Sequence, residues 1–159
     1  MVTVGQKLTT DFTLNVVSDG GAREIVFSDL LTRPTVVSVY MKNNTPSCDR
    51  QTESLAAHAT EFTALGYQLI ALSRDTCGSH MKYAEKKGLG YILASDPTDA
   101  FARATDSIVE KTMYGKTYQG PARAAFVLAP DATVLAVIAK VDTKNHAAQL
   151  KAVLAQLGR

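Results

Sequence analysis

The first forty residues carry apolar side chains in short, strand-like patterns. Polar and apolar types alternate over Asp11–Val17, and Glu24–Phe27 follows after the turn residues Ser18-Asp19-Gly20-Gly21. This arrangement predicts a β-hairpin. Pro34 then precedes Thr35–Met41, an almost unbroken run of β-branched and other apolar residues. Such a run predicts a short strand that is buried on both faces of a sheet.

After this strand, apolar residues recur at helical spacing in three segments, separated by further short strands. Leu55, Ala59, Phe62 and Leu65 predict one long helix that ends at Gly66. The remaining expected elements are strands at Tyr67–Leu72, Tyr91–Ala94, Arg123–Leu128 and Thr133–Val141, a helix from Asp75 or Thr76 to about Lys87, a short helix through Phe101, a last helix with Ala147, Leu150, Leu154 and Leu157 on one face, and an irregular loop at 105–121.

Alternating strands and helices with a hairpin at each end predict an α/β fold: a central mixed β-sheet flanked by helices, with an N-terminal β-hairpin. We expect one domain over residues 1–159, because no linker, repeat or low-complexity tract divides the chain. Functional sites in such sheets form beyond the carboxyl ends of central strands. The loop that follows Met41 is one of these ends, and Cys48 lies in it.

Composition narrows the class of protein. Apolar residues make up 46% of the chain, charged residues 20%, and the net charge is +2. This balance is that of an ordinary globular protein and favours neither nucleic acid nor a membrane as partner. The N-terminal residues show no signal-peptide pattern, so we expect a cytoplasmic protein, in which two cysteines do not form a disulfide scaffold.

Cys48 is placed where a thiol can become reactive. It follows a predicted central strand and precedes a predicted helix. The start of a helix presents backbone N–H groups and the positive end of the helix dipole, and both favour the thiolate. The thiolate is the form of cysteine that attacks peroxides and disulfides. Position alone does not separate this role from that of an inert core cysteine.

The segment Tyr40-Met41-Lys42-Asn43-Asn44-Thr45-Pro46-Ser47-Cys48 resembles the active-site segment of peroxiredoxins, and specifically of the bacterioferritin-comigratory-protein, or peroxiredoxin Q, subfamily. The resemblance extends over nearly the whole chain, through 11–14, 95–97, 113–118 and 122–126. It implies a thioredoxin-like fold and a thiol-dependent peroxidase that acts on hydrogen peroxide and organic hydroperoxides. It also implies a peroxidatic role for Cys48, with Thr45 and Arg123 as catalytic partners and Ser47 beside them in the substrate site.

The chain departs from the family pattern at two positions. Met41 stands where the family usually has proline, and Ser47 where it usually has glycine. Ser47 still offers a backbone N–H to a bound peroxide. Thr45 could also act as a plain helix N-cap, and Arg123 as one half of a surface salt bridge.

Ionisation of Cys48 cannot by itself produce a peroxidase. Lowering a thiol pKa by about three units raises the thiolate fraction about 30-fold at pH 7, but the loss of nucleophilicity gives back roughly 15- to 30-fold. The remaining acceleration must come from donors aimed at the departing oxygen, where negative charge grows. The fixed guanidinium of Arg123 and the hydroxyl of Thr45 suit this task.

A resolving step would need a second thiol. Relatives carry a resolving cysteine at the positions of Glu53 or Ala84, and neither is cysteine here. Cys77 is the remaining candidate, but it shares a helical stripe with Met81 and Ala84. Three readings stay open: Cys77 as a packing residue in a one-cysteine enzyme, Cys77 as the resolving cysteine of an atypical two-cysteine enzyme, and an intermolecular role.

The reductant of a one-cysteine enzyme would be an external thiol: thioredoxin, glutaredoxin or a small thiol. Other functions compatible with the sequence are a thiol–disulfide oxidoreductase, although Thr45 replaces the first cysteine of a C-x-x-C motif, and a redox sensor. We expect no cofactor and no metal. His58, His80 and His146 should be solvated or cap helices, Lys111 and Lys116 should be solvated, and Tyr114 and Tyr118 should lie at the pocket mouth or pack within their loop.

Overall fold

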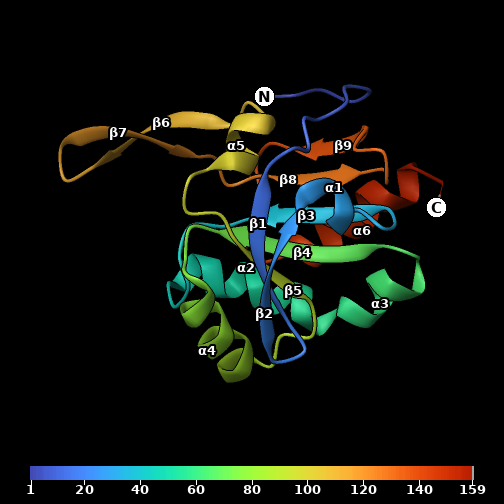
Figure 1. The fold of residues 1–159 in the computed structure, drawn as a ribbon, viewed down its shortest axis with the longest axis horizontal. Coiled ribbons are helices and arrows are strands. Elements are labelled where there is room, and N and C mark those ends of the chain that lie inside the picture. Colours follow the sequence, from blue (N-terminus) through green and yellow to red (C-terminus); the bar gives the residue numbers. More distant parts are fainter. Residues whose placement is uncertain (159) are drawn as a thin grey trace.

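The computed structural model describes residues 1–158 and contains a seven-stranded mixed sheet in the order β2-β1-β5-β4-β3-β8-β9 (Figure 1). β3 pairs in parallel with β4, and β4 with β5, while the other neighbours are antiparallel. The strands are β1 Thr13–Ser18, β2 Gly21–Val26, β3 Thr35–Val39, β4 Gln68–Ser73, β5 Ile92–Ser95, β8 Ala125–Leu128 and β9 Val134–Ile138.

Helices cover both faces of this sheet. The longer ones lie on one face, and their apolar side chains form a core with that face. Two short helices and the N-terminal segment cover the other face with a second core. The first group comprises α2 Pro46–Ala57, α3 Ala59–Ala64, α4 Cys77–Lys87 and α6 His146–Gln156, and the second comprises α1 Phe27–Leu30 and α5 Ala100–Ala104.

β3 lies inside the sheet and is buried along its whole length. Its side chains alternate between the two cores, with Val36 on the face of the long helices and Val37 and Val39 on the other. The unbroken apolar run in the sequence reflects this burial on both faces. The strand ends at Val39, and the chain then leads through a short loop into α2.

The expected fold class is confirmed: a central mixed sheet flanked by helices, opened by an N-terminal hairpin. The seven strands of this sheet lie within about three residues of their predicted bounds. The short helix α1 was not predicted. Its Phe27 and Leu30 are buried against the sheet, and a single turn of helix is too short to show periodicity in the sequence.

The prediction of one long helix up to Gly66 is wrong, because the helix breaks at His58 into α2 and α3. His58 has φ −123° and ψ 12°, outside helical geometry, and its N–H bonds back to the carbonyl of Leu55. Leu55 and Phe62 are both buried, so the apolar spacing survives the break. Leu65 is 46% exposed and lies outside the core.

The prediction of an irregular loop at 105–121 is also wrong. This segment contains a second, two-stranded sheet, β6 Ile108–Met113 and β7 Lys116–Pro121, which projects from the body of the molecule (Figure 1). Tyr114 and Gly115 form its turn, and both have positive φ (53° and 75°), as a tight hairpin turn requires. Both faces of the hairpin are largely exposed, so its strands lack the alternation of polar and apolar residues by which strands are predicted.

Candidate active site

Cys48 lies in the first turn of α2, directly beyond the carboxyl end of β3, as the sequence predicts. Thr45 is the N-cap residue of the helix and Pro46 its first residue. Proline suits this position because its fixed φ matches the helix and its missing N–H would have no partner there. The N–H groups of Ser47 and Cys48 belong to the turn that has no intrahelical acceptors. Cys48 itself is 1% exposed.

Burial alone would raise the pKa of the Cys48 thiol, but the pKa lies below its ordinary value. Hydrogen bonding by the Thr45 side chain and by the backbone of Lys42 and Met41 favours the thiolate, and the positive charge of Arg123 adds to this effect. The loop 41–45 therefore forms a cradle for negative charge on sulfur. The result is a buried thiol that ionises more readily than a free cysteine.

Thr45 does not cap the helix with its side chain. Its hydroxyl donates to the carbonyl of Lys42 at 2.7 Å, which turns the side chain back into the loop that holds Cys48. The hydroxyl of Ser47 accepts a hydrogen bond from Arg50 at 3.1 Å. The side chain of Ser47 is thereby directed to the surface of α2, and its contribution to the site is its backbone N–H.

Arg123 reaches the sulfur from a different part of the chain. It precedes β8, next to the end of β3, where the N–H of Val39 donates to the carbonyl of Ala124 at 2.8 Å. Its Nη1 lies 3.4 Å from Cys48 Sγ. None of the ion pairs among residues 1–158 involves Arg123. The alternative role of Arg123 in a salt bridge therefore has no support within this part of the chain.

Gln51 is a site residue that the sequence analysis did not identify. It lies one turn after Cys48 on α2, is fully buried, and accepts a hydrogen bond from Arg123 Nη1 at 2.7 Å. Its amide nitrogen donates to Ser38 Oγ and to the carbonyl of Val39. Its spacing in the sequence could have identified it, because a polar residue three positions after Cys48 lies on the same helix face as the thiol.

The loop that carries Thr45 is tied to α4 through Asn43. The N–H of Asn43 donates to Asp75 at 3.0 Å, and its side chain lies between Tyr40 and His80. His80 donates through Nε2 to the carbonyl of Ala94, so its Nδ1 accepts from the amide of Asn43. The expectation that His80 and His146 are solvated or cap helices is wrong, since both are fully buried and hydrogen-bonded.

A second set of bonds joins α2 to α4 beside Cys48. The hydroxyl of Tyr83 donates to Asp49 at 2.6 Å and also contacts the hydroxyl of Thr52 at 2.7 Å. Lys87 at the end of α4 pairs with Glu53, one of the positions where relatives carry a resolving cysteine. These bonds hold the first turns of α2, and with them the thiol, against a fixed neighbour.

Lys111 of β6 is not solvated as expected but is partly buried at the active site. Its Nζ donates to the sulfur of Met41 at 2.7 Å. Burial lowers the pKa of Lys111, and the like charges of Arg123 and Arg74 lower it further, while the Cys48 thiolate acts in the opposite direction. Met41, which replaces the family's usual proline, thus forms a contact between the thiolate loop and the projecting hairpin.

Cys77 is the first residue of α4 and is partly buried against the core. It lines a hollow with residues of β1 and β2, including Arg23 and Glu24. Burial raises the pKa of its thiol, so Cys77 is less readily ionised than a free cysteine. Both cysteines are free thiols in the structure. Of the predicted stripe, Ala84 packs on the core, whereas Met81 is 40% exposed.

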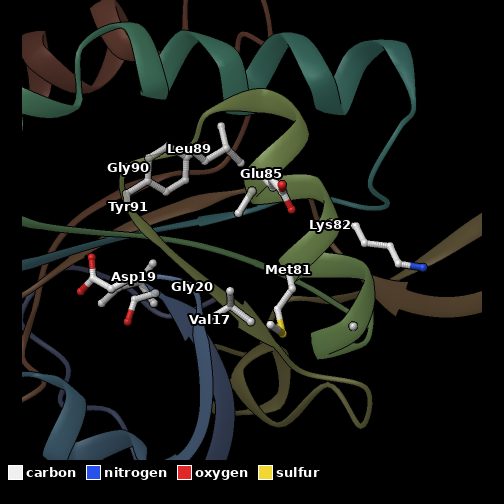
Figure 2. Close-up of a pocket in the computed structure, with 13 residues that line it drawn as sticks. Val17, Asp19, Gly20, Met81, Lys82, Glu85, Leu89, Gly90 and Tyr91 are labelled. Carbon is white, nitrogen blue, oxygen red and sulfur yellow. The ribbon is translucent and has the colours of Figure 1, made fainter.

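A hollow of about 800 Å³ lies away from the active site. It lies between α4 and the turn of the β1–β2 hairpin, where Met81 and Val17 face each other (Figure 2). None of the candidate site residues lines it. Tyr114 is 96% exposed in the turn of the second hairpin, so it does not pack within its loop, while Tyr118 lies cross-strand from Lys111.

Two further features of residues 1–158 bear on function. These residues contain no cluster of three or more His, Cys, Asp or Glu side chains suited to hold a metal ion. Their helices include none long and apolar enough to cross a lipid bilayer.

Comparison with known proteins identifies the family of the chain. Residues 4–137 match the AhpC/TSA family. The chain is 38% identical over 122 residues to peroxiredoxin Bcp of Xanthomonas campestris pv. campestris, across 77% of this chain and 74% of that protein. Its fold superimposes on the structure of X. campestris bacterioferritin comigratory protein with a TM-score of 0.84 at 30% identity, over 98% of this chain and 99% of that one. That structure was determined to study alkyl peroxide reduction. A mutant of X. campestris peroxiredoxin Q gives a TM-score of 0.87 at 29% identity, with the same coverage.

The chain therefore belongs to the AhpC/TSA family and has its thioredoxin-like fold. Within that family it is a thiol-dependent peroxidase, related to the Bcp and peroxiredoxin Q proteins.

Proposed function

We propose that Cys48 is the peroxidatic nucleophile and that the enzyme reduces hydrogen peroxide and organic hydroperoxides. The Cys48 thiolate attacks one peroxide oxygen, the O–O bond breaks, and that oxygen with its hydrogen stays on sulfur as a sulfenic acid. The second oxygen leaves with the bonding electron pair and becomes water or an alcohol after taking a proton. The negative charge thus moves from sulfur to the departing oxygen.

The observation that carries this proposal is the position of Arg123 Nη1, 3.4 Å from Cys48 Sγ and free of any carboxylate among the described residues. A peroxide bound at the thiolate would lie against the same guanidinium. The N–H groups of Ser47 and Cys48, and the Thr45 hydroxyl once it turns from the carbonyl of Lys42, supply further donors. Donors fixed in this way stabilise the charge that develops as the O–O bond breaks.

We further propose that the cycle uses one cysteine and that an external thiol reduces the sulfenic acid. Cys48 contacts Arg123, which precedes β8, and β8 lies near one edge of the sheet. Cys77 instead lines a hollow with β1 and β2, which lie at the other edge. Burial raises the pKa of the Cys77 thiol, so less of it is present as thiolate at neutral pH. Thioredoxin, glutaredoxin and small thiols are the candidate reductants, acting on a single-domain enzyme in the cytoplasm.

The test is mass spectrometry after one equivalent of hydrogen peroxide, with a dimedone-type probe present. We expect one adduct, on Cys48, and no peroxide consumption by Cys48→Ser. Cys77→Ser serves as the matched control and should retain peroxide consumption. If Cys48→Ser keeps more than a few per cent of the activity, Cys48 is not the nucleophile.

A further inference from the structure

A chain of buried polar side chains runs from α6 through β3 and α2 to Arg123. Its members Ser38, Gln51 and His146 are each fully buried. His146 Nε2 lies 2.9 Å from Ser38 Oγ, and Gln51 Nε2 lies 2.8 Å from the same oxygen. Gln51 Oε1 then accepts from Arg123 Nη1 at 2.7 Å. The chain ends at the guanidinium that contacts the Cys48 sulfur.

The end of this chain at Arg123 has a single hydrogen-bonding direction. Arg123 can only donate, and the carbonyl of Val39 can only accept. Gln51 must therefore present Oε1 to Arg123 and Nε2 to Val39, at 3.1 Å, and to Ser38. A flipped amide would face a donor with its own donor and a carbonyl with its own oxygen, and would lose the bonds on both sides.

Backbone groups fix the direction at the far end as well. Gln149 accepts from the N–H of Asp142 and donates to the carbonyl of Lys140, so its Oε1 is the atom that faces His146 Nδ1 at 3.2 Å. His146 must then carry its proton on Nδ1 and accept at Nε2, where the Ser38 hydroxyl donates. Burial lowers the pKa of His146, which keeps the ring neutral in this arrangement.

We propose that Ser38 and His146 are positioning residues for Arg123, and that they act through Gln51. Ser38 holds the Gln51 amide in its one satisfied orientation, and His146 holds the Ser38 hydroxyl. Gln51 can then offer Arg123 a fixed neutral acceptor that leaves the guanidinium directed at Cys48. This inference rests on the proposed function, since it assigns a purpose to the position of Arg123.

The competing explanation is that these bonds only pack α6 against the sheet. A packing role predicts lower stability after Ser38→Ala but no specific loss in the rate of peroxide attack. A positioning role predicts a loss in rate that depends on Arg123. Residues that act through one another show non-additive effects, so a double-mutant cycle separates the two explanations.

The test measures the second-order rate constant for loss of the Cys48 thiol in hydrogen peroxide, by rapid quenching and mass spectrometry, together with the Tm of each variant. We expect Ser38→Ala to slow the reaction about tenfold, a fraction of the loss from removing a transition-state donor. His146→Phe should slow it similarly. In an Arg123→Met background, Ser38→Ala should cause no further loss.

The matched control is Thr35→Val, which removes another fully buried hydroxyl from the same strand, one that bonds to the carbonyl of Arg33. It should lower the Tm but leave the rate constant unchanged. Equal rates for Ser38→Ala and the wild type, or an equal slowing by Ser38→Ala with and without Arg123, would overturn the inference. If wild-type Cys48 itself fails to react with peroxide, the proposed function fails instead.

Discussion

At the scale of single residues, the important property of Arg123 is that a neutral side chain holds it. Gln51 accepts its hydrogen bond at 2.7 Å without compensating its charge. A carboxylate in the same place would pair with the guanidinium and weaken its attraction for the thiolate and for the departing oxygen. Arg123 thus combines a fixed position with an uncompensated charge, the two properties that transition-state stabilisation requires.

Replacing Arg123 by Met should slow attack on hydrogen peroxide by about a hundredfold or more, because one donor to the departing oxygen is lost. The pKa of the Cys48 thiol should rise too little to account for this loss in rate. The charge of Arg123 lowers that pKa less than the hydrogen bonds from Thr45, Lys42 and Met41 do. Stopped-flow or quenched-flow kinetics and a separate thiol titration give the two quantities. Arg123→Lys keeps the positive charge but removes the planar guanidinium, so it separates the effect of charge from that of the fixed donor positions. A pKa rise large enough to explain the whole loss in rate would contradict this role.

Cys77 provides a second prediction at this scale. Cys77→Ala should keep most of the peroxidase activity when a small thiol is the reductant, at a cost of about 1 kcal/mol or less in stability, because the side chain is only partly buried. Excess peroxide should carry Cys48 on to the sulfinic acid, with Cys77 still a free thiol by alkylation and mass spectrometry. Formation of a Cys48–Cys77 disulfide faster than dimedone trapping would show a two-cysteine cycle instead.

At the scale of elements, the sequence predicted those segments whose burial imposes a pattern. β3 was identified because it is buried on both faces. Cys48 was identified because it follows that strand in a segment that resembles the peroxiredoxin active site. The hairpin β6–β7 was missed because both its faces are largely exposed, and its exposure removes the pattern. Gln51 and His146 were missed for a related reason: a buried polar residue is recognised by its partners, and Ser38, the partner of both, is distant in sequence from His146.

The hairpin's role in the site can be tested through Lys111. Its ammonium group contacts Met41 and carries positive charge close enough to favour the Cys48 thiolate. Lys111→Met should therefore raise the thiolate pKa by a few tenths of a unit and slow peroxide attack by at most about twofold at neutral pH, because a shift of this size changes the thiolate fraction by no more than about that factor. Lys116→Met, on the exposed end of the same hairpin, is the control and should change neither quantity. Equal effects of the two substitutions would show that the hairpin acts only through overall charge.

At the scale of the whole molecule, two buried histidines join elements that lie far apart in the sequence. His80 links α4 to the active-site loop and to β5, and His146 links α6 to β3. Burial is the main cause that lowers the pKa of each ring. Both networks therefore require neutral imidazole, and protonation opposes the fold that positions Cys48.

The free energy of unfolding should consequently fall as the pH falls below about 6.5, the pKa of histidine in an unfolded chain. Below that pH the unfolded state binds protons that the folded state excludes, and each histidine contributes up to about 1.4 kcal/mol per pH unit until the folded ring is protonated as well. The lowered pKa of Cys48 acts in the same direction, whereas the Asp96 carboxyl, whose pKa burial raises, acts in the opposite one.

Urea unfolding between pH 7.5 and 5.5 isolates the histidine contribution by comparing variants. His146→Gln removes one titrating ring and should flatten the dependence by up to about 1.4 kcal/mol per pH unit, although the variant is less stable at every pH. If His146→Gln shows the same pH dependence as the wild type, His146 is not held neutral by the fold, and the proton arrangement derived for the Ser38–Gln51–Arg123 chain is wrong.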